Sequence, residues 1–194
     1  MISLPGVRVG AGGVAIGVLG DQDRPPTQID VFVDYMCPFC RHFERDNGAD
    51  VQELVDRGVA SLIMHPIAIL DRLSAGTMYS TRAAAAAYAV AAGAPAEFGA
   101  FNAALFRDQP REGGPGLSQA ELAAIAQGVG IKRKVALTFA DDQFMREAGE
   151  ATRAAIEAGV QGTPTVLLSG HHQGAHLWDG SRPISESLLS LAAR

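Results

Sequence analysis

The sequence predicts an α/β fold in which an all-helical subdomain is inserted into a sheet-containing core. Three observations lead to this prediction: a strand–helix–strand pattern over 29–67, an alanine-rich helical stretch over 74–158, and a return of strand character after Gly159. A strand, a helix and a strand within about 40 residues are typical of a parallel βαβ unit with a right-handed crossover. We therefore predict a first part of the core over 1–73, the helical insertion over 74–158 and a second part of the core over 159–194.

The first part of the core is expected to contain three strands and one helix. A short apolar run over 14–17 predicts an edge strand, and the β-branched and aromatic residues of 29–35 predict a buried central strand. A helix is expected over 38–57, because Pro38 suits the first turn of a helix. The alternation of side chains over 59–67 predicts the next strand.

The middle of the chain is rich in helix-forming residues, above all alanine. Ser118 is followed three residues later by Glu121, a pairing typical of a capping box at the start of a helix. A loop is expected over 110–116, where proline and glycine gather. Further helices are predicted over 81–92, 97–106, 133–139 and 142–158.

The last part of the chain again has the composition of a sheet-containing core. Residues 165–168 predict a short buried strand, and 174–178 predict a last strand. Residues 185–193 predict a terminal amphipathic helix.

Composition excludes several classes of function. The 194 residues are 47% hydrophobic and 19% charged, with a net charge of −5, as in ordinary globular proteins. No clustered basic face is visible, so we expect no nucleic-acid partner. No apolar stretch reaches the roughly 18–20 residues of a membrane span.

The N-terminal residues lack the features of an export signal, so the chain as written is expected to be cytoplasmic. If such a signal has been removed, the protein is expected to be periplasmic or otherwise extracytoplasmic. The oligomeric state is left open.

The two cysteines of the chain both lie in the run Cys37-Pro38-Phe39-Cys40. No cysteine is left over for a structural disulfide elsewhere, so the pair is expected to do chemistry or to bind a metal. A strand before the run and a helix after it place Cys37 at a helix N-terminus, which favours its thiolate. Cys40 follows about one turn later and is expected to point inward. Cys37 is then the catalytic nucleophile that forms a mixed disulfide, and Cys40 is the catalytic thiol that resolves it.

A metal site is the alternative interpretation of the cysteine pair. Zinc would need two further ligands. The histidines of the chain are His42, His65, His171, His172 and His176. No second Cys-x-x-Cys and no spaced histidine pair completes a usual zinc pattern, so redox chemistry is favoured and no metal is expected.

A second motif, Gly162-Thr163-Pro164-Thr165, comes directly before a predicted strand. Because proline cannot donate to a sheet ladder, Pro164 is expected at the first position of that strand. A cis bond between Thr163 and Pro164 would bring this loop beside the cysteines. The backbone of Thr163 could then bind an extended substrate segment, so Thr163 and Pro164 are predicted to bind substrate.

Together, Asp34-Tyr35 before the cysteine pair and the run 159–165 resemble the DsbA-like branch of the thioredoxin superfamily. The resemblance covers nearly the whole chain. It implies a thioredoxin-like fold with an inserted all-helical subdomain, and an enzyme that exchanges disulfides with protein substrates. Its partners would be the thiols and disulfides of unfolded or redox-partner proteins. It further implies a cis-proline at Pro164 and no bound cofactor.

The sequence departs from relatives at positions that matter for redox chemistry. Phe39 stands where the strongly oxidising members have a histidine, so the direction of exchange is open. Val31 stands six residues before Cys37, where thioredoxins and many relatives have a buried acid. Asp34 is the nearest acid, and it is either a substitute for that group or an exposed residue. Pro38, Phe39 and Asp34 are therefore predicted to support the cysteines.

Other side chains near the motif have simpler expected roles. Tyr35, Met36 and Phe39 are expected to form an apolar rim around the reactive sulfur. His42 is expected to face away from Cys40, and Trp178 is expected to lie in the core.

Two other functions stay open on the sequence alone. The first is a glutathione-dependent isomerase or transferase of the same fold branch, although such relatives usually have a serine where Cys37 stands. The second is a non-enzymatic, thioredoxin-fold module that binds a metal or acts as a chaperone.

Overall fold

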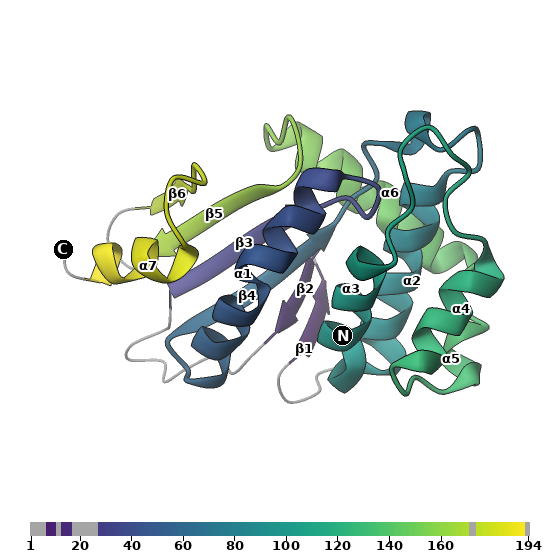
Figure 1. Cartoon of the computed structure of the whole chain (residues 1–194), viewed down its shortest axis with the longest axis horizontal. Helices are drawn as coiled ribbons and strands as arrows, with labels where there is room; N and C mark the ends of the chain where they lie inside the picture. Colours follow the sequence, from purple (N-terminus) through teal and green to yellow (C-terminus); the bar gives the residue numbers. More distant parts are fainter. Residues whose placement is uncertain (1–6, 11–12, 17–26, 171–173, 193–194) are drawn as a thin grey trace.

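The computed structural model of the chain describes residues 7–10, 13–16, 27–170 and 174–192. Within this part the strands form one six-stranded sheet in the order β1-β2-β4-β3-β5-β6 (Figure 1). Their bounds are β1 (Val7–Gly10), β2 (Gly13–Ile16), β3 (Thr27–Val33), β4 (Ala60–Pro66), β5 (Thr165–Gly170) and β6 (Gly174–Leu177).

The centre of the sheet is the predicted βαβ unit. Strand β3 pairs in parallel with β4, and helix α1 (Pro38–Asp56) connects them. On its other side β3 pairs antiparallel with β5, which places the second part of the core beside the first. Apolar residues alternate along β3 and are buried at Ile29, Val31 and Val33, as a strand with one covered face requires.

The expectation that 14–17 form an edge strand is wrong. Strand β2 pairs antiparallel with β4 on one side and with β1 on the other, so both of its edges are hydrogen-bonded. The edge is β1, a strand of four residues that the sequence analysis did not predict.

Between β4 and β5 the chain is helical, as predicted. The helices are α2 (Tyr79–Gly93), α3 (Phe98–Arg107), α4 (Gln119–Gly128), α5 (Arg133–Ala136) and α6 (Asp142–Glu157), with short 3-10 turns at Asp71–Leu73 and Pro95–Glu97. Helix α2 lies at the centre of this group, and its five alanines 83–87 are fully buried. Small side chains allow the neighbouring helices α3, α5 and α6 to approach it closely. The boundaries at 73–74 and 158–159 stay predictions.

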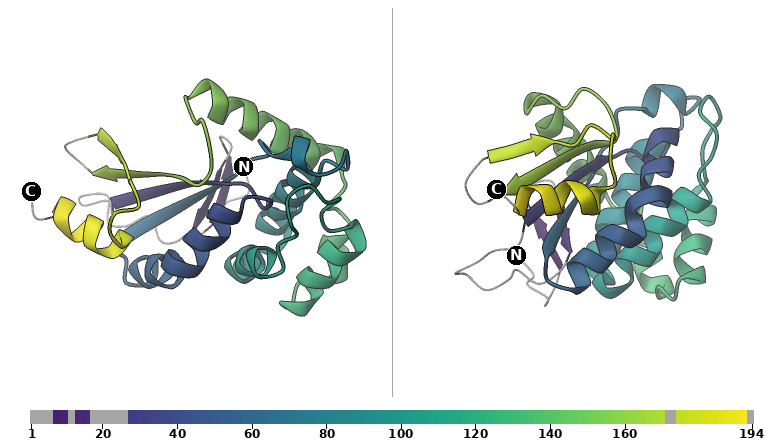
Figure 2. Two further views of the ribbon diagram at one scale, coloured as in Figure 1. Left: turned by 45° about the horizontal axis from the view of Figure 1, so that its top comes forward. Right: turned by 60° about the vertical axis from the view of Figure 1, so that its left-hand side comes forward.

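Figures 1 and 2 show the helical group at one end of the sheet, where β3 leads into α1. Helix α6 returns from this group to the core and contacts β4.

The predicted capping box at the start of α4 is confirmed. The Ser118 hydroxyl accepts from the Glu121 N–H, and the Glu121 carboxylate accepts from the Ser118 N–H.

Helix α7 (Ile184–Ala192) packs beside α1, over the same face of the sheet (Figure 2). The Ile184 N–H donates to the side chain of Asn47 in α1.

Trp178 is partly buried and packs against the core rather than lying at its centre, and its ring meets that of Phe43 edge-on. In the described residues no helix is long and apolar enough to cross a membrane.

Candidate active site

The active-site turn, residues 34–37, connects the end of β3 to the start of α1. The Cys37 N–H donates to the Asp34 carbonyl oxygen over 3.0 Å, which closes the turn. Cys37 is the N-cap of α1 with an extended backbone, and Pro38 is the first helical residue. The Cys37 carbonyl accepts from the N–H groups of Cys40 and Arg41. The Cys37 side chain therefore lies at the helix N-terminus, as predicted, where backbone N–H groups favour a negative charge.

Both cysteines are free thiols, and both are buried. Cys40 is fully buried, as expected, but Cys37 is only 4% exposed and does not lie at an open edge. The reason is the loop before β5, because the Cys37 thiol donates to the carbonyl oxygen of Thr163 over 3.1 Å.

The predicted apolar rim is wrong for two of its three residues. Tyr35 and Met36 are fully buried, whereas Phe39 is 68% exposed. Tyr35 turns inward because its ring contacts Phe106 and its hydroxyl donates to the side chain of Asn102. Phe39 alone of the three is available on the surface. His42 is exposed, and its ring meets that of Phe39 edge-on.

The predicted cis bond between Thr163 and Pro164 is confirmed. It lies directly before β5, which begins at Thr165. The Thr165 hydroxyl donates to the Gly162 carbonyl and fixes the loop. The pairing of β5 with β3 places this loop beside Cys37, although 126 residues separate Cys37 from Thr163.

The surroundings of the two sulfurs separate their acidities. The pKa of Cys37 is lowered to about 6, chiefly by the hydrogen bond from the Cys40 side chain. Burial of Cys37 opposes this shift. The Thr163 side chain and the N–H groups of Cys40 and Phe39 lower the pKa further. Burial raises the pKa of Cys40 well above its usual value, and the neighbouring Cys37 raises it too. The pair therefore contains one thiol that ionises readily and one that does not.

Asp34 is fully buried, so the exposed alternative for this residue is wrong. One carboxylate oxygen accepts from the Met36 N–H (2.9 Å) and the Ser80 hydroxyl (2.7 Å), and the other accepts from the Leu70 N–H (2.9 Å). Burial raises the pKa of Asp34 to about 6; these hydrogen bonds oppose the rise, and the charge of Cys37 adds to it. Val31, at the position of the acid in thioredoxins, is fully buried.

Gln109 is a site residue that the sequence analysis missed. It lies two residues after the end of α3, in the loop that leads to α4. Its side-chain N–H₂ group donates to the carbonyl oxygen of Tyr35 over 3.1 Å and to that of Cys37 over 2.9 Å. No sequence signal marks it, because a single glutamine before a proline belongs to no motif.

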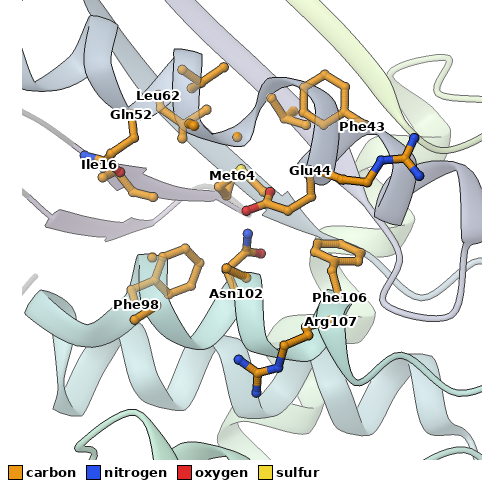
Figure 3. Close-up of a pocket in the computed structure, with 18 of the residues that line it drawn as sticks. Ile16, Phe43, Glu44, Gln52, Leu62, Met64, Phe98, Asn102, Phe106 and Arg107 are labelled. Carbon is orange, nitrogen blue, oxygen red and sulfur yellow. The ribbon is translucent and has the colours of Figure 1, made fainter.

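A groove of about 830 Å³ lies between α1 and α3 (Figure 3). Its walls are mostly apolar, and Glu44 and Asn102 point toward each other across it. Burial raises the pKa of Glu44, and a hydrogen bond from Asn102 opposes the rise. The groove could not be predicted from the sequence, because it depends on how closely two helices from separate parts of the chain approach each other.

The described residues include no group of three histidine, cysteine, aspartate or glutamate side chains that could hold a metal ion. Of the histidines considered as zinc ligands, His65 pairs with Asp30 over 2.8 Å. His171 and His172 lie outside the described residues, as does the side chain of His176.

Comparison with known proteins agrees with this geometry. A family model described as Thioredoxin matches residues 16–182. The reduced form of DsbA from Mycobacterium tuberculosis superposes with a TM-score of 0.76 at 28% identity, over 95% of this chain and 94% of that one. The reduced disulfide bond oxidoreductase DsbG from the same organism superposes with a TM-score of 0.74 at 30% identity, over 92% of this chain and 84% of that one.

A curated protein also matches, but over a part of its length. The serine/threonine-protein kinase PknE of M. tuberculosis is 31% identical over 186 residues, which are 92% of this chain and 31% of that protein. This chain therefore spans about a third of the length of that relative. None of these likenesses supports the cytoplasmic placement expected from the N-terminal residues. The family model, which matches most of the chain, establishes that the chain belongs to the thioredoxin family, and the superpositions show that its structure is similar to those of DsbA and DsbG over nearly its whole length.

Proposed function

We propose that this protein donates its disulfide to protein thiols, with Cys37 as the reacting sulfur. The observation that supports this direction is the position of Cys37 at the N-cap of α1, beside Cys40 and the Thr163 loop, which together lower the pKa of Cys37 to about 6. Every interaction that stabilises the Cys37 thiolate stabilises the reduced protein relative to the disulfide form. A stabilised reduced form makes the disulfide easier to give up, so the protein is a better oxidant.

The exchange proceeds in two balanced steps. A substrate thiolate attacks Cys37 Sγ in the Cys37–Cys40 disulfide, the S–S bond breaks, and Cys40 leaves and takes up a proton. A second substrate thiolate then attacks the substrate sulfur of the mixed disulfide, and Cys37 leaves as a thiolate. The substrate gains a disulfide, and the protein gains the two electrons as a dithiol. A leaving thiol with a lowered pKa leaves faster, which suits Cys37 to the second step.

The loop at Thr163 and Pro164 supports a role in binding the substrate backbone. The loop lies beside the reacting sulfur. Because Pro164 has no N–H with which to pair to a neighbouring strand, an extended polypeptide can approach the loop backbone there. Phe39 presents an exposed aromatic ring close by, suited to apolar side chains of an unfolded segment. We therefore assign unfolded proteins with free thiols as the substrate class. Because disulfides persist in oxidising compartments, the working place is outside the cytoplasm.

The experiment that tests the direction is equilibration of the protein in glutathione buffers of graded potential, with the thiol–disulfide ratio measured by alkylation and mass spectrometry. A disulfide donor should have a potential clearly less negative than that of thioredoxin, about −270 mV, and toward the −120 mV of DsbA. A potential at or below that of thioredoxin would identify a reductant and contradict the proposal.

A histidine at position 39 should make the protein more oxidising. A protonated imidazole between the cysteines would favour the Cys37 thiolate electrostatically, whereas Phe39 has no charge. We expect Phe39→His to lower the pKa of Cys37 and to shift the potential to less negative values. The pKa is measured from the ultraviolet absorbance of the thiolate, with Phe39→Leu as the uncharged control. An equal shift in both variants would show that loss of the ring, rather than the added charge, is responsible.

A further inference from the structure

The backbone of the active-site turn is held from two sides. On one side Asp34 accepts hydrogen bonds from two N–H groups of the turn. The Met36 N–H donates to its carboxylate, and the Cys37 N–H donates to its backbone carbonyl. On the other side the carbonyl oxygens of Tyr35 and Cys37 need donors. The N–H groups at the start of α1 reach the Cys37 carbonyl, but none of them reaches that of Tyr35. Because Tyr35 is fully buried, a donor from the protein is required there.

Gln109 supplies donors to both carbonyls with one amide group. Its nitrogen has two hydrogens, and the two acceptors lie 3.1 Å and 2.9 Å away. The backbone of Gln109 is itself restricted, because its N–H donates to the Phe106 carbonyl and Pro110 follows it. Its side chain is half-buried. The donor is therefore presented from a fixed point at the end of α3.

Helix α3, which ends two residues before Gln109, contacts Tyr35 at two further points. The Tyr35 hydroxyl donates to the Asn102 side chain over 3.0 Å, and its ring lies 5.0 Å from that of Phe106, centre to centre. Figure 3 shows Asn102 and Phe106 along the side of α3 that faces α1. The helical subdomain thus contacts the hydroxyl, the ring and the carbonyl of Tyr35. Among these contacts, that of Gln109 is the one that also reaches Cys37.

We propose that Gln109 is a positioning residue, whose amide holds the Tyr35 and Cys37 carbonyls so that the Cys37 sulfur stays at the N-terminus of α1. This inference rests on the exchange reaction proposed above. The N–H groups of Phe39 and Cys40 favour the thiolate only while Cys37 keeps its extended N-cap backbone, with a ψ of 116°. Without Gln109 the Tyr35 carbonyl has no donor and the Cys37 carbonyl keeps only the N–H groups of Cys40 and Arg41, so the turn between Tyr35 and Cys37 is freer to rotate. The Cys37 sulfur then loses contact with the helix N–H groups and with Thr163.

Two substitutions separate hydrogen bonding from packing. Gln109→Met keeps the length of the side chain and removes both donors. Gln109→Glu keeps the shape and places acceptor oxygens against two carbonyl oxygens, so its effect should be the larger. Gln127→Met is the matched control, because Gln127 is exposed near the C-terminal end of α4, outside the loop that contacts the active-site turn.

The measurement is the initial rate at which the reduced protein attacks an aromatic disulfide, 5,5′-dithiobis(2-nitrobenzoate), from pH 5 to pH 9. If the pKa of Cys37 rises by about one unit, the thiolate fraction at low pH falls about tenfold, while the thiolate becomes about threefold more nucleophilic. We therefore expect Gln109→Met to react about threefold more slowly at pH 5 and about threefold faster at pH 9. Its profile should cross that of the wild-type protein, and Gln109→Glu should be displaced further in the same direction.

Each possible result decides a different question. Profiles of both Gln109 variants that coincide with those of the wild type and Gln127→Met would overturn the positioning role while leaving the exchange intact. A uniform loss of rate at every pH, together with a lower melting temperature, would assign Gln109 to folding alone and would also overturn it. A wild-type rate that Cys37→Ser does not change would instead contradict the proposed function.

Discussion

Replacing Cys40 with serine is expected to trap a covalent complex between Cys37 and a disulfide-containing protein. In the reverse direction of the proposed exchange, the Cys37 thiolate attacks a substrate disulfide and becomes linked to one of its sulfurs. Cys40 normally resolves this link, because it lies against the Cys37 sulfur and is fully buried. A serine hydroxyl cannot attack the disulfide, so the complex should persist for hours where that of the wild-type protein is short-lived.

The complex is detected as a band of higher mass on a non-reducing gel that disappears on addition of reductant. The reduced Cys40→Ser protein is incubated with a denatured protein whose disulfides are intact. Cys37→Ser is the paired control and should form no complex, because Cys40 is shielded from solvent and burial raises its pKa well above the usual value. Trapping by Cys37→Ser rather than by Cys40→Ser would reverse the assigned roles of the two cysteines.

The parts of the site that could be predicted from the sequence are those set by neighbours along the chain. The position of Cys37 at a helix N-terminus follows from a strand before it and Pro38 after it. The cis bond between Thr163 and Pro164 was predicted from a proline directly before a strand, and the family resemblance also implies it. The order of strands and helices was predicted from local patterns too, because strands and helices differ in the spacing of their apolar residues.

The parts that could not be predicted depend on residues from distant segments. Asp34 is buried because Leu70 and Ser80, 36 and 46 residues away, donate to its carboxylate. Gln109 donates to the Cys37 carbonyl although 72 residues separate the two, and no local sequence pattern predicts such a contact. Tyr35 was expected on the surface, and it is buried because α3 supplies a polar partner for its hydroxyl. Packing between the helical subdomain and the core thus determines what surrounds the cysteines.

The reduced protein should become more stable, relative to Cys37→Ser, as the pH rises from 6 to 9. The pKa of Cys37 is about 6 in the folded protein and 9.0 in the unfolded reference, so folding favours the thiolate. A group whose pKa is lowered by folding contributes its full stability above the unfolded value and loses it as the pH falls through the folded value. Three units correspond to about 4 kcal/mol, an upper value because screening by solvent reduces it.

Asp34 has the opposite effect in a different pH range. Its pKa rises from 3.8 to about 6 on folding, so the stability that its protonated form contributes is present below pH 3.8 and is lost as the pH rises through 6. Both proteins keep Asp34, so this loss cancels when their free energies of unfolding are subtracted, apart from the small part of the rise that the charge of Cys37 itself causes. The difference therefore reports the Cys37 thiolate together with its effect on Asp34 and Cys40, and it is measured by urea unfolding in the presence of a phosphine reductant at each pH. A difference that stays constant between pH 6 and pH 9 would show that folding does not stabilise the Cys37 thiolate, and would contradict the proposal that the protein donates its disulfide.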